Sequence, residues 1–275
     1  MNSMKGRRVV ITGATSGIGR EIATALASLG AELVLACRDV ERGERTAGDI
    51  LHSTNAAVLA VMPVDVSTQD SIRQFAREYR DRFSGPDVLI NNAGIIRSGR
   101  ETSVDGIELT FATNVLGYFL LTLELLHGLK ADAPARIVNV ASSYASEPDF
   151  GDLQFEQRAY DGMQAYAQSK ACDRLLTWAL ARRLQESGVT ANAMAPGLVM
   201  TELYRDLPPE ARLALEKMGA RTVPEGADTA VWLASSPEVE GVSGRFFEQR
   251  KEIPCEFRNE VAEERLWGIC QSLVG

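Results

Sequence analysis

The chain has 275 residues, of which 45% are hydrophobic and 24% charged, and a formal net charge of 29 − 37 = −8. These values are ordinary for a soluble globular protein and exclude an intrinsically disordered chain. A chain of this length buries a sizeable core without disulfides. The acidic balance argues against a general nucleic-acid binder, because that function draws on clustered Lys and Arg.

Metal-ligand residue types are few and scattered, without a C-x-x-C pair. They are His52, His127, Cys37, Cys172, Cys255 and Cys270. We therefore expect no metal site and a reducing, cytoplasmic location. No window holds the ~18 to 20 uninterrupted apolar residues of a spanning helix, and the N-terminus has the pattern of neither an export signal nor a membrane anchor. We expect no membrane partner.

Apolar runs of strand length alternate with amphipathic segments of helix length. The predicted strands span residues 7–12, 32–36, 57–62, 87–91, 135–141, 189–195 and 244–248. The predicted helices span residues 17–29, 40–52, 68–83, 104–126, 164–186 and 256–273, with short helices opened by Pro208-Pro209 and by Pro224. Strands that are apolar on both faces are typical of a parallel sheet covered by helices. We predict a single α/β domain over residues 1–275, with a doubly wound parallel sheet of about seven strands.

The first strand, a glycine-rich turn and a helix follow one another over residues 9–19. Gly13 allows a tight turn, Gly17 lets the backbone approach a pyrophosphate, and Gly19 lets the helix pack closely on the strand. The helix N-terminus then presents unpaired N–H groups and a positive dipole end to phosphates. The pattern predicts a Rossmann-type dinucleotide site, and a merely flexible turn is the alternative. The other expected cofactor contacts in this turn are Thr15, Ser16 and Ile18.

The end of the second strand carries Cys37 and then Arg38. A carboxylate at this strand tip would bind both ribose hydroxyls, whereas an arginine pairs with a 2′-phosphate. We therefore hypothesise NADP(H), with Arg38 as the phosphate ligand and Arg42 as its support. NAD(H) is the alternative, because Asp39 is either the N-cap of the next helix, which we favour, or a ribose acceptor.

Polar residues also follow the third and fourth strands. Asp65 either accepts a hydrogen bond from the adenine amino group or caps the helix that starts near Thr68. In the run Asn91-Asn92-Ala93-Gly94, paired amides can brace a turn while a small backbone lies against the cofactor; an ordinary polar turn is the alternative. The expected cofactor contacts here are Asp65, Val66, Asn92, Ala93 and Gly94.

Tyr166 and Lys170 stand four apart on a predicted helix, so both project from one face. Ser143, or as second choice Ser142, ends the fifth strand at the edge where open α/β sheets bind ligands. A tyrosine ordinarily ionises near pH 10, and a nearby ammonium stabilises the phenolate. With a serine hydroxyl to hold the substrate oxygen, this set suits proton transfer in reversible carbonyl reduction.

Asn114 lies inside a helical apolar pattern, although asparagine is a poor helix former. A buried amide there must find partners. It either holds a water in a proton relay that ends at Lys170 or is a satisfied residue at a helix kink.

These motifs together resemble the short-chain dehydrogenase/reductase family over nearly the whole chain. The ordered set is Thr12-Gly13-(x)3-Gly17-x-Gly19, Asn91-Asn92-Ala93-Gly94, Asn114, Ser143, Tyr166-(x)3-Lys170 and Pro196-Gly197-(x)3-Thr201. The resemblance implies that Tyr166 is the acid/base, that Lys170 and Ser143 are its partners, and that Asn114 serves as relay. It also implies that Tyr166, Lys170, Pro196, Gly197, Val199 and Thr201 meet the nicotinamide end, with Pro196-Gly197 against the ring and Thr201 on the carboxamide.

Finer features are similar to the retinol dehydrogenase-like subgroup. They are Ala36-Cys37-Arg38-Asp39, the insertion over residues 144–164, the run over residues 196–203, and Ser243-Gly244-Arg245-Phe246-Phe247. The subgroup implies a preference for NADP(H) and lipophilic alcohols or carbonyls. The chain departs from it in Ala195, where many relatives have histidine, and in lacking an apolar segment before the first strand. We therefore expect a soluble reductase.

The activity expected is hydride transfer between NADP(H) and a small-molecule carbonyl or alcohol. A non-catalytic NAD(P)-sensing regulator and an epimerase or dehydratase are the alternatives. We expect the loop over residues 203–224 and the extension over residues 251–275 to line an apolar pocket, unless their apolar side chains only pack helices. Those side chains are Leu203, Tyr204, Leu207, Leu213 and Met218. By resemblance, the long helices would form a homodimer or homotetramer surface.

Overall fold

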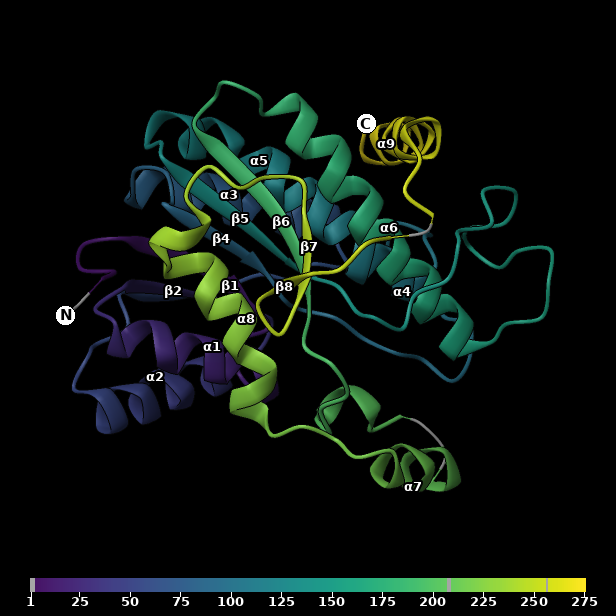
Figure 1. Ribbon diagram of the computed structural model, residues 1–275, viewed down its shortest axis with the longest axis horizontal. Coiled ribbons are helices and arrows are strands. Elements are labelled where there is room, and N and C mark those ends of the chain that lie inside the picture. The colour runs from purple at the N-terminus through teal and green to yellow at the C-terminus, as the bar shows by residue number, and fades with distance from the viewer. Residues whose placement is uncertain (1–2, 207–208, 256) are drawn as a thin grey trace.

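A mostly parallel sheet organises the computed structural model, which describes residues 3–206, 209–255 and 257–275 (Figure 1). The strand order is β3-β2-β1-β4-β5-β6-β7-β8, and β8 runs antiparallel to β7. The order reverses between β1 and β4, which is where open α/β sheets bind ligands. The strands are β1 Arg8–Thr12, β2 Glu32–Cys37, β3 Ala60–Pro63, β4 Val88–Asn91, β5 Ala135–Val140, β6 Val189–Ala195, β7 Phe246–Glu248 and β8 Lys251–Glu252.

Helices cover both faces of this sheet (Figure 1). On one face α1 packs against α2 and α8; on the other α3 packs against α5, and α6 against α9. Val9 and Val10 show why the strands are apolar throughout, since each joins the core on a different side of the sheet. The helices are α1 Gly17–Ser28, α2 Val40–Thr54, α3 Gln69–Arg82, α4 Leu109–Phe111, α5 Gly117–Ala131, α6 Gly162–Arg183, α7 Pro209–Lys217, α8 Val223–Ser235 and α9 Glu260–Val274. Shorter turns are the π-helical η1 Ala112–Leu116 and the 3₁₀ turns η2 Glu202–Tyr204 and η3 Pro237–Val239.

The predicted doubly wound sheet is confirmed, with one strand more than expected among the described residues. The turn between β7 and β8 places Gln249 and Arg250 at φ values of 51° and 59°, where a two-residue hairpin turn usually carries Asn or Gly. Arg250 is held there from α8, because its N–H donates to Thr229 Oγ1 at 3.1 Å and its guanidinium pairs with Asp228. This hairpin turn is therefore held by contacts with α8 and not by the Asn or Gly residues that usually mark such a turn in a sequence.

The predicted helix over residues 104–126 begins later and ends later than expected. Glu108 caps it, because its side chain accepts hydrogen bonds from the N–H groups of Thr110 and Phe111. The turn before it contains Gly106 at φ 76°. By length and composition, the continuous helix over residues 109–131 could cross a membrane, but most of it is buried in the protein core.

The C-terminal part differs most from the sequence expectation. Pro209 and Pro224 open α7 and α8 as predicted, and α8 is a full helix with a Thr222–Glu225 capping box. α9 starts after its cap Asn259 rather than at residue 256; Leu207, Pro208 and Glu256 lie outside the described residues. The described residues of the extension over residues 251–275 do not line the cleft at the carboxyl ends of the strands that is described below, and α9 packs on α6 instead.

Candidate active site

A cleft of about 340 Å³ opens at the carboxyl ends of the strands, the edge expected from the sequence. Most predicted cofactor contacts line it: Gly13, Thr15, Ser16, Gly17, Ile18, Gly19, Arg38, Asp65, Val66, Asn92, Ala93, Gly94, Tyr166, Lys170, Pro196 and Thr201. Four predicted site residues do not line it: Asn114, Ser143, Gly197 and Val199. The expectation that these four residues form part of the site is therefore not met by the cleft as it stands.

The glycine turn leaves no room for side chains. A Cβ on Gly13, which has a φ of 66°, would lie 2.8 Å from the Cα of Ala93, and a Cβ on Gly19 would lie 2.3 Å from the carbonyl oxygen of Gly13. The first turn of α1 carries no acidic residue, and the N-cap Ser16 makes no side-chain capping bond. The N–H groups of this helix end therefore suit an anion such as a pyrophosphate.

Thr12 and Asn92 hold the glycine turn against the end of β4. The Thr12 hydroxyl accepts hydrogen bonds from the N–H groups of Asn92 and Ala93 at 2.9 and 3.1 Å. The Asn92 amide donates to the carbonyl oxygens of Thr12 and Gly13 at 2.9 and 3.2 Å. The predicted brace is thus present, and the threonine at the strand end completes it.

At the end of β2, Arg38 lines the cleft, whereas the nearby Asp39 and Arg42 side chains are bound to other residues. Asp39 is the N-cap of α2, as favoured, and accepts the N–H of Arg42 at 2.9 Å. The Arg42 guanidinium pairs with Glu202 at 2.5 Å across the cleft mouth. Within the described part of the chain, Arg38 forms no ion pair, so it is the better placed of the two arginines for a phosphate.

Asp65 lies in the turn after β3 and lines the cleft beside Val66. Its carboxylate accepts hydrogen bonds from Ser67, from the N–H at 2.9 Å and the hydroxyl at 2.6 Å. The N-cap of α3 is Thr68, so Asp65 is not the cap of this helix. Its carboxylate instead fixes the turn on which the adenine site would be built.

Tyr166 and Lys170 lie together at the inner end of the cleft, and both are buried. α6 carries them one turn apart, after Asp161 caps the helix. The Lys170 ammonium lies 5.9 Å from the centroid of the Tyr166 ring. It donates hydrogen bonds to the Val140 carbonyl at 2.9 Å and to Asp173 at 2.8 Å. The predicted pair is therefore assembled, with a carboxylate that the sequence analysis did not include.

The serine assignment needs correction. Ser143 donates a 2.5 Å hydrogen bond to Glu248 on β7, and neither Ser143 nor Ser142 is among the residues that line the cleft. The hydroxyl of Ser142, the second choice, accepts the N–H of Tyr144 at 3.0 Å and is the serine hydroxyl that lowers the pKa of Tyr166. The chain leaves β5 in a fixed direction, because Arg174 donates to the Ser142 carbonyl. This turn sends the two adjacent side chains to different partners.

The charges around Tyr166 differ from the expected ones. Burial raises the pKa of Tyr166 to about 12; the hydrogen bond with Ser142 opposes this rise, and the negative charge of Asp173 adds to it. Burial lowers the pKa of Lys170, but the Asp173 carboxylate and the Tyr118 phenol reverse this effect and raise it overall. Lys170 is thus held as an ammonium whose charge is shared with Asp173.

Asn114 lies in the π-helical turn η1 and is completely buried. Its amide donates to the Ile95 carbonyl at 3.1 Å and to the Ser169 hydroxyl at 2.9 Å, while its oxygen accepts the N–H of Ile95 at 2.9 Å. Both N–H donors of the side chain are used. The geometry matches the alternative of a satisfied residue at a helix irregularity, which fixes the backbone beside Gly94.

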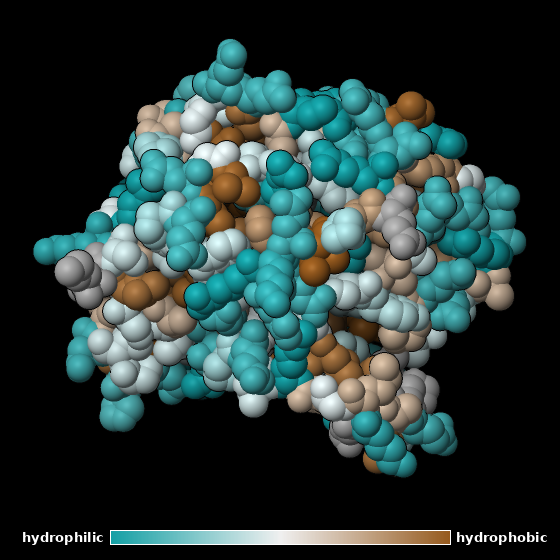
Figure 2. Space-filling view, viewed as in Figure 1, coloured by the Kyte–Doolittle hydropathy of each residue, from teal (hydrophilic) through white to brown (hydrophobic). Residues whose placement is uncertain are grey.

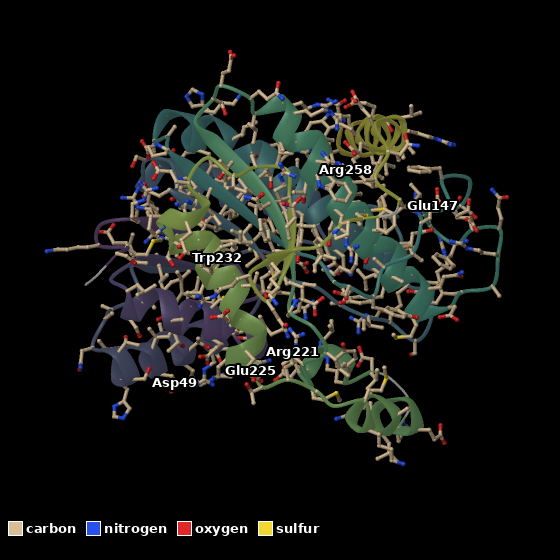
Figure 3. All side chains as sticks on the ribbon, viewed as in Figure 1. Asp49, Glu147, Arg221, Glu225, Trp232 and Arg258 are labelled. Atoms are coloured by element: carbon tan, nitrogen blue, oxygen red, sulfur yellow. The ribbon has the colours of Figure 1, made fainter. Side chains whose placement is uncertain are left out.

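In the segment over residues 196–201 only the two ends line the cleft. Thr201 caps η2, and its methyl group lies 3.0 Å from the position of a Cβ on Gly17. Gly197 lies under Arg221, whose guanidinium carbon would be 2.8 Å from a Cβ there. Arg221 follows α7 just before α8 (Figure 3) and pairs with Glu248 at 3.0 Å, so Gly197 supports the segment from behind.

An apolar cluster surrounds Tyr166 beyond the polar end of the cleft. Leu203 and Tyr204 belong to it as predicted, and its other members are Ile96, Met163 and Leu215. Leu213 and Met218 are 51% and 73% exposed, so the prediction that they line the pocket is wrong. Both lie on or after α7, which projects from the body of the molecule (Figure 1).

Comparison with known proteins agrees with this geometry. The family model for short chain dehydrogenases matches residues 7–212. The chain belongs to the short-chain dehydrogenase family. It is 38% identical to human retinol dehydrogenase 13, over 99% of this chain and 86% of that protein. It is 40% identical to human retinol dehydrogenase 12, over 99% of this chain and 87% of that protein.

This short-chain dehydrogenase is also similar to solved structures, some of which contain NADP. An uncharacterized Mycobacterium paratuberculosis protein matches with a TM-score of 0.78 and 32% identity, over 98% of this chain and 94% of that one. The Burkholderia cenocepacia gluconate 5-dehydrogenase in complex with NADP and tartrate matches with a TM-score of 0.72 and 28% identity, over 89% and 93%. The chain is therefore an NAD(P)-dependent dehydrogenase or reductase that acts on alcohol or carbonyl groups.

Two charged residues of this short-chain dehydrogenase site were missed from the sequence. Asp173 contacts Lys170, and Arg174 lies 3.8 Å over the Phe246 ring while it donates to Ser142. Both stand in the buried run over residues 165–180 of α6. Charged residues within an otherwise apolar or small-residue stretch of a core helix were the available signal, because buried charges require partners.

Proposed function

We propose that the chain catalyses reversible hydride transfer between NADP(H) and the alcohol or carbonyl carbon of an apolar small molecule. The observation that carries this proposal is the position of Tyr166, which lines the cleft together with Lys170 and belongs to the apolar cluster beside it. A phenol and an ammonium at one end of a dinucleotide-sized cleft, with the Ser142 hydroxyl near the phenol, suit proton transfer to an oxygen. The alternative of a non-catalytic sensor does not account for this set.

The residues present fit an NADP molecule. The α1 turn would hold the pyrophosphate, the turn at Asp65 and Val66 the adenine, and Arg38 the 2′-phosphate. Because Asp39 is used as a helix cap, the strand end offers a free cation rather than a carboxylate, which supports NADP(H) over NAD(H). When bound, the nicotinamide ring supplies or accepts the hydride.

The residues of the protein transfer the proton and stabilise the charges that this transfer creates. In reduction Tyr166 gives its hydroxyl proton to the carbonyl oxygen, and in oxidation its phenolate takes the proton of the alcohol. Ser142 donates a hydrogen bond to the same oxygen and stabilises the charge that develops on it. The Lys170 ammonium, 5.9 Å from the centroid of the Tyr166 ring, stabilises the phenolate electrostatically. In our proposal Ser142 replaces Ser143, because Ser143 is bound to Glu248.

The substrate would be apolar next to its reacting oxygen. Ile96, Met163, Leu203, Tyr204 and Leu215 form the cluster at Tyr166. Figure 2 shows hydrophobic side chains in the hollow where the α7 lobe meets the body. The relatives named retinol dehydrogenases act, by their names, on a long apolar alcohol, which supports an apolar alcohol or aldehyde for this chain.

A substrate panel tests this proposal. Oxidation of NADPH would be followed with aldehydes and ketones of increasing apolar size, including retinal, and with gluconate-derived keto sugars as the polar control. We expect kcat/KM to rise with apolar size. A preference for the polar control would contradict the substrate class. Tight NADPH binding without turnover on the whole panel would favour the sensor instead.

A further inference from the structure

The catalytic lysine forms a buried ion pair that lies beneath the cleft. Asp173 is on α6 three residues after Lys170, and its carboxylate accepts a hydrogen bond from the ammonium at 2.8 Å. The exposed fractions of the two side chains are 0% and 4%. Because the two side chains have so little contact with solvent, water screens their charges only weakly, and these charges act strongly on neighbouring groups.

We propose that Asp173 is a positioning residue that anchors the Lys170 ammonium and compensates its charge, so that Tyr166 senses an ion pair rather than a free cation. This inference rests on the proposed function, in which Tyr166 exchanges a proton with substrate. It assigns to Asp173 a part in setting the pH at which that exchange occurs.

The Lys170 ammonium lies closer to the Asp173 carboxylate than to the Tyr166 ring. The Lys170 nitrogen is 2.8 Å from the Asp173 oxygen but 5.9 Å from the centroid of the Tyr166 ring. At the ring, the negative charge of Asp173 opposes the field of the ammonium and raises the pKa of Tyr166. The second anchor of Lys170 is the Val140 carbonyl at 2.9 Å, which carries no full charge. Asp173 is thus the group that decides how much positive charge faces Tyr166.

The other groups that face Asp173 do not replace this role. Besides Lys170, they are Tyr166, Cys172 and Arg174 on α6, Tyr118 on α5 and Cys270 on α9. Arg174 is the other cation, but its guanidinium donates to the Ser142 carbonyl and lies over Phe246. Lys170 is therefore the cation in hydrogen-bond contact with Asp173.

Asp173 remains able to ionise in spite of its burial. It borders a cavity of about 20 Å³ together with Tyr118, Thr122 and Asn139, which is room for one water molecule. Burial raises the pKa of Asp173 to about 7, against the lowering effect of Lys170 and Arg174. Above about pH 7 the carboxylate is charged, and its charge raises the pKa of Tyr166.

The Asp173→Asn variant tests the inference, because it keeps the shape and removes the charge. We expect the rising limb of kcat/KM for alcohol oxidation to move down by about one pH unit, since a neighbouring charge typically shifts a pKa by about one to three units. The matched control is Thr177→Val, which removes a hydroxyl that donates to the Asp173 backbone carbonyl at 2.6 Å without changing charge. An unmoved limb in Asp173→Asn, or an equal shift in Thr177→Val, would overturn the inference.

A measurement without turnover separates this inference from the proposed function. Tyrosine labelled at 13Cζ reports phenolate by NMR, and the Tyr166→Phe variant identifies the Tyr166 signal. At about pH 10.5 we expect roughly tenfold more phenolate at Tyr166 in Asp173→Asn than in the unaltered chain, because one pKa unit is a factor of ten. Equal phenolate in both would contradict the role of Asp173 even if the enzyme reduces carbonyls.

A second pair of variants covers the case in which Asp173→Asn alone does not fold. Lys170→Met is compared with Lys170→Met/Asp173→Asn, so that no buried cation is left without a partner. The double variant is expected to show more Tyr166 phenolate than the single variant at the same pH. An equal or smaller amount would contradict the inference.

Discussion

Ser143 donates a 2.5 Å hydrogen bond to Glu248, a residue on β7 that also pairs with Arg221 at 3.0 Å. This contact commits Ser143 to the sheet edge and leaves its neighbour Ser142 as the hydroxyl next to Tyr166. We expect Ser142→Ala to lower kcat/KM by about 10²- to 10³-fold, as for loss of one oxyanion donor. Ser143→Ala, measured with the same carbonyl, is the control and should change it by less than about tenfold. The reverse order of effects would restore Ser143 as the substrate-binding serine.

Arg38 is expected to decide between the two nicotinamide cofactors. Arg38→Ala should lower kcat/KM with NADPH by about 10- to 100-fold, because a hydrogen bond to a charged group contributes roughly 1.5–3 kcal/mol. The value with NADH should change little. Arg42→Ala is the comparison variant, with a smaller expected effect because Arg42 is paired with Glu202. Equal losses with both cofactors in Arg38→Ala would contradict the phosphate assignment.

Gly19 is expected to tolerate no side chain. A Cβ there would lie 2.3 Å from both the Gly13 carbonyl oxygen and the Asn92 amide nitrogen, so the glycine turn must distort. We expect Gly19→Ala to weaken NADPH binding more than tenfold and to lower the free energy of unfolding by about 1–3 kcal/mol. The control is Gly48→Ala on α2, where a Cβ meets nothing within 4 Å and helix propensity predicts a gain of about 1 kcal/mol. Unchanged NADPH binding in Gly19→Ala would contradict the close approach.

Asp173 should make the free energy of unfolding of the chain depend on pH. Its pKa is raised from an ordinary 3.8 to about 7 by burial, so between these values the folded state holds a proton that the unfolded state has released. The free energy of unfolding should therefore fall as pH rises from about 4 to about 7 through this group. In Asp173→Asn that contribution is absent, so the unaltered chain should lose more stability than the variant between pH 5 and pH 8 in urea titrations. An equal change in both chains would show that Asp173 keeps an ordinary pKa.

Most of the fold follows from local sequence signals. Strands such as β1 and β6 are apolar on both faces, and the glycine turn and Asp39 mark the starts of α1 and α2. The β7–β8 hairpin could not be predicted, because Gln249 and Arg250 hold their left-handed conformations through contacts with Thr229 and Asp228. Tertiary contacts of this kind leave no periodic pattern along the chain.

The parts of the candidate site that a short spacing motif defines could be predicted from the sequence. Tyr166, Lys170 and the glycine turn lie where their spacing placed them. The choice between Ser142 and Ser143 depends on the direction of the backbone after β5, which Arg174 fixes from α6. The partner of Lys170 depends on which face of α6 is buried, and Asp173 lies within a stretch buried on all sides. Neither property is encoded in a short motif.

Transfer of deuterium from NADPH labelled at C4 of the nicotinamide tests the central claim most directly. With the unaltered chain and an apolar aldehyde, the label is expected on the carbinol carbon of the product. Tyr166→Phe should bind NADPH with unchanged affinity but transfer the label about 10²- to 10⁴-fold more slowly, as for loss of a general acid. An unlabelled product, or transfer at full rate by Tyr166→Phe, would contradict the account.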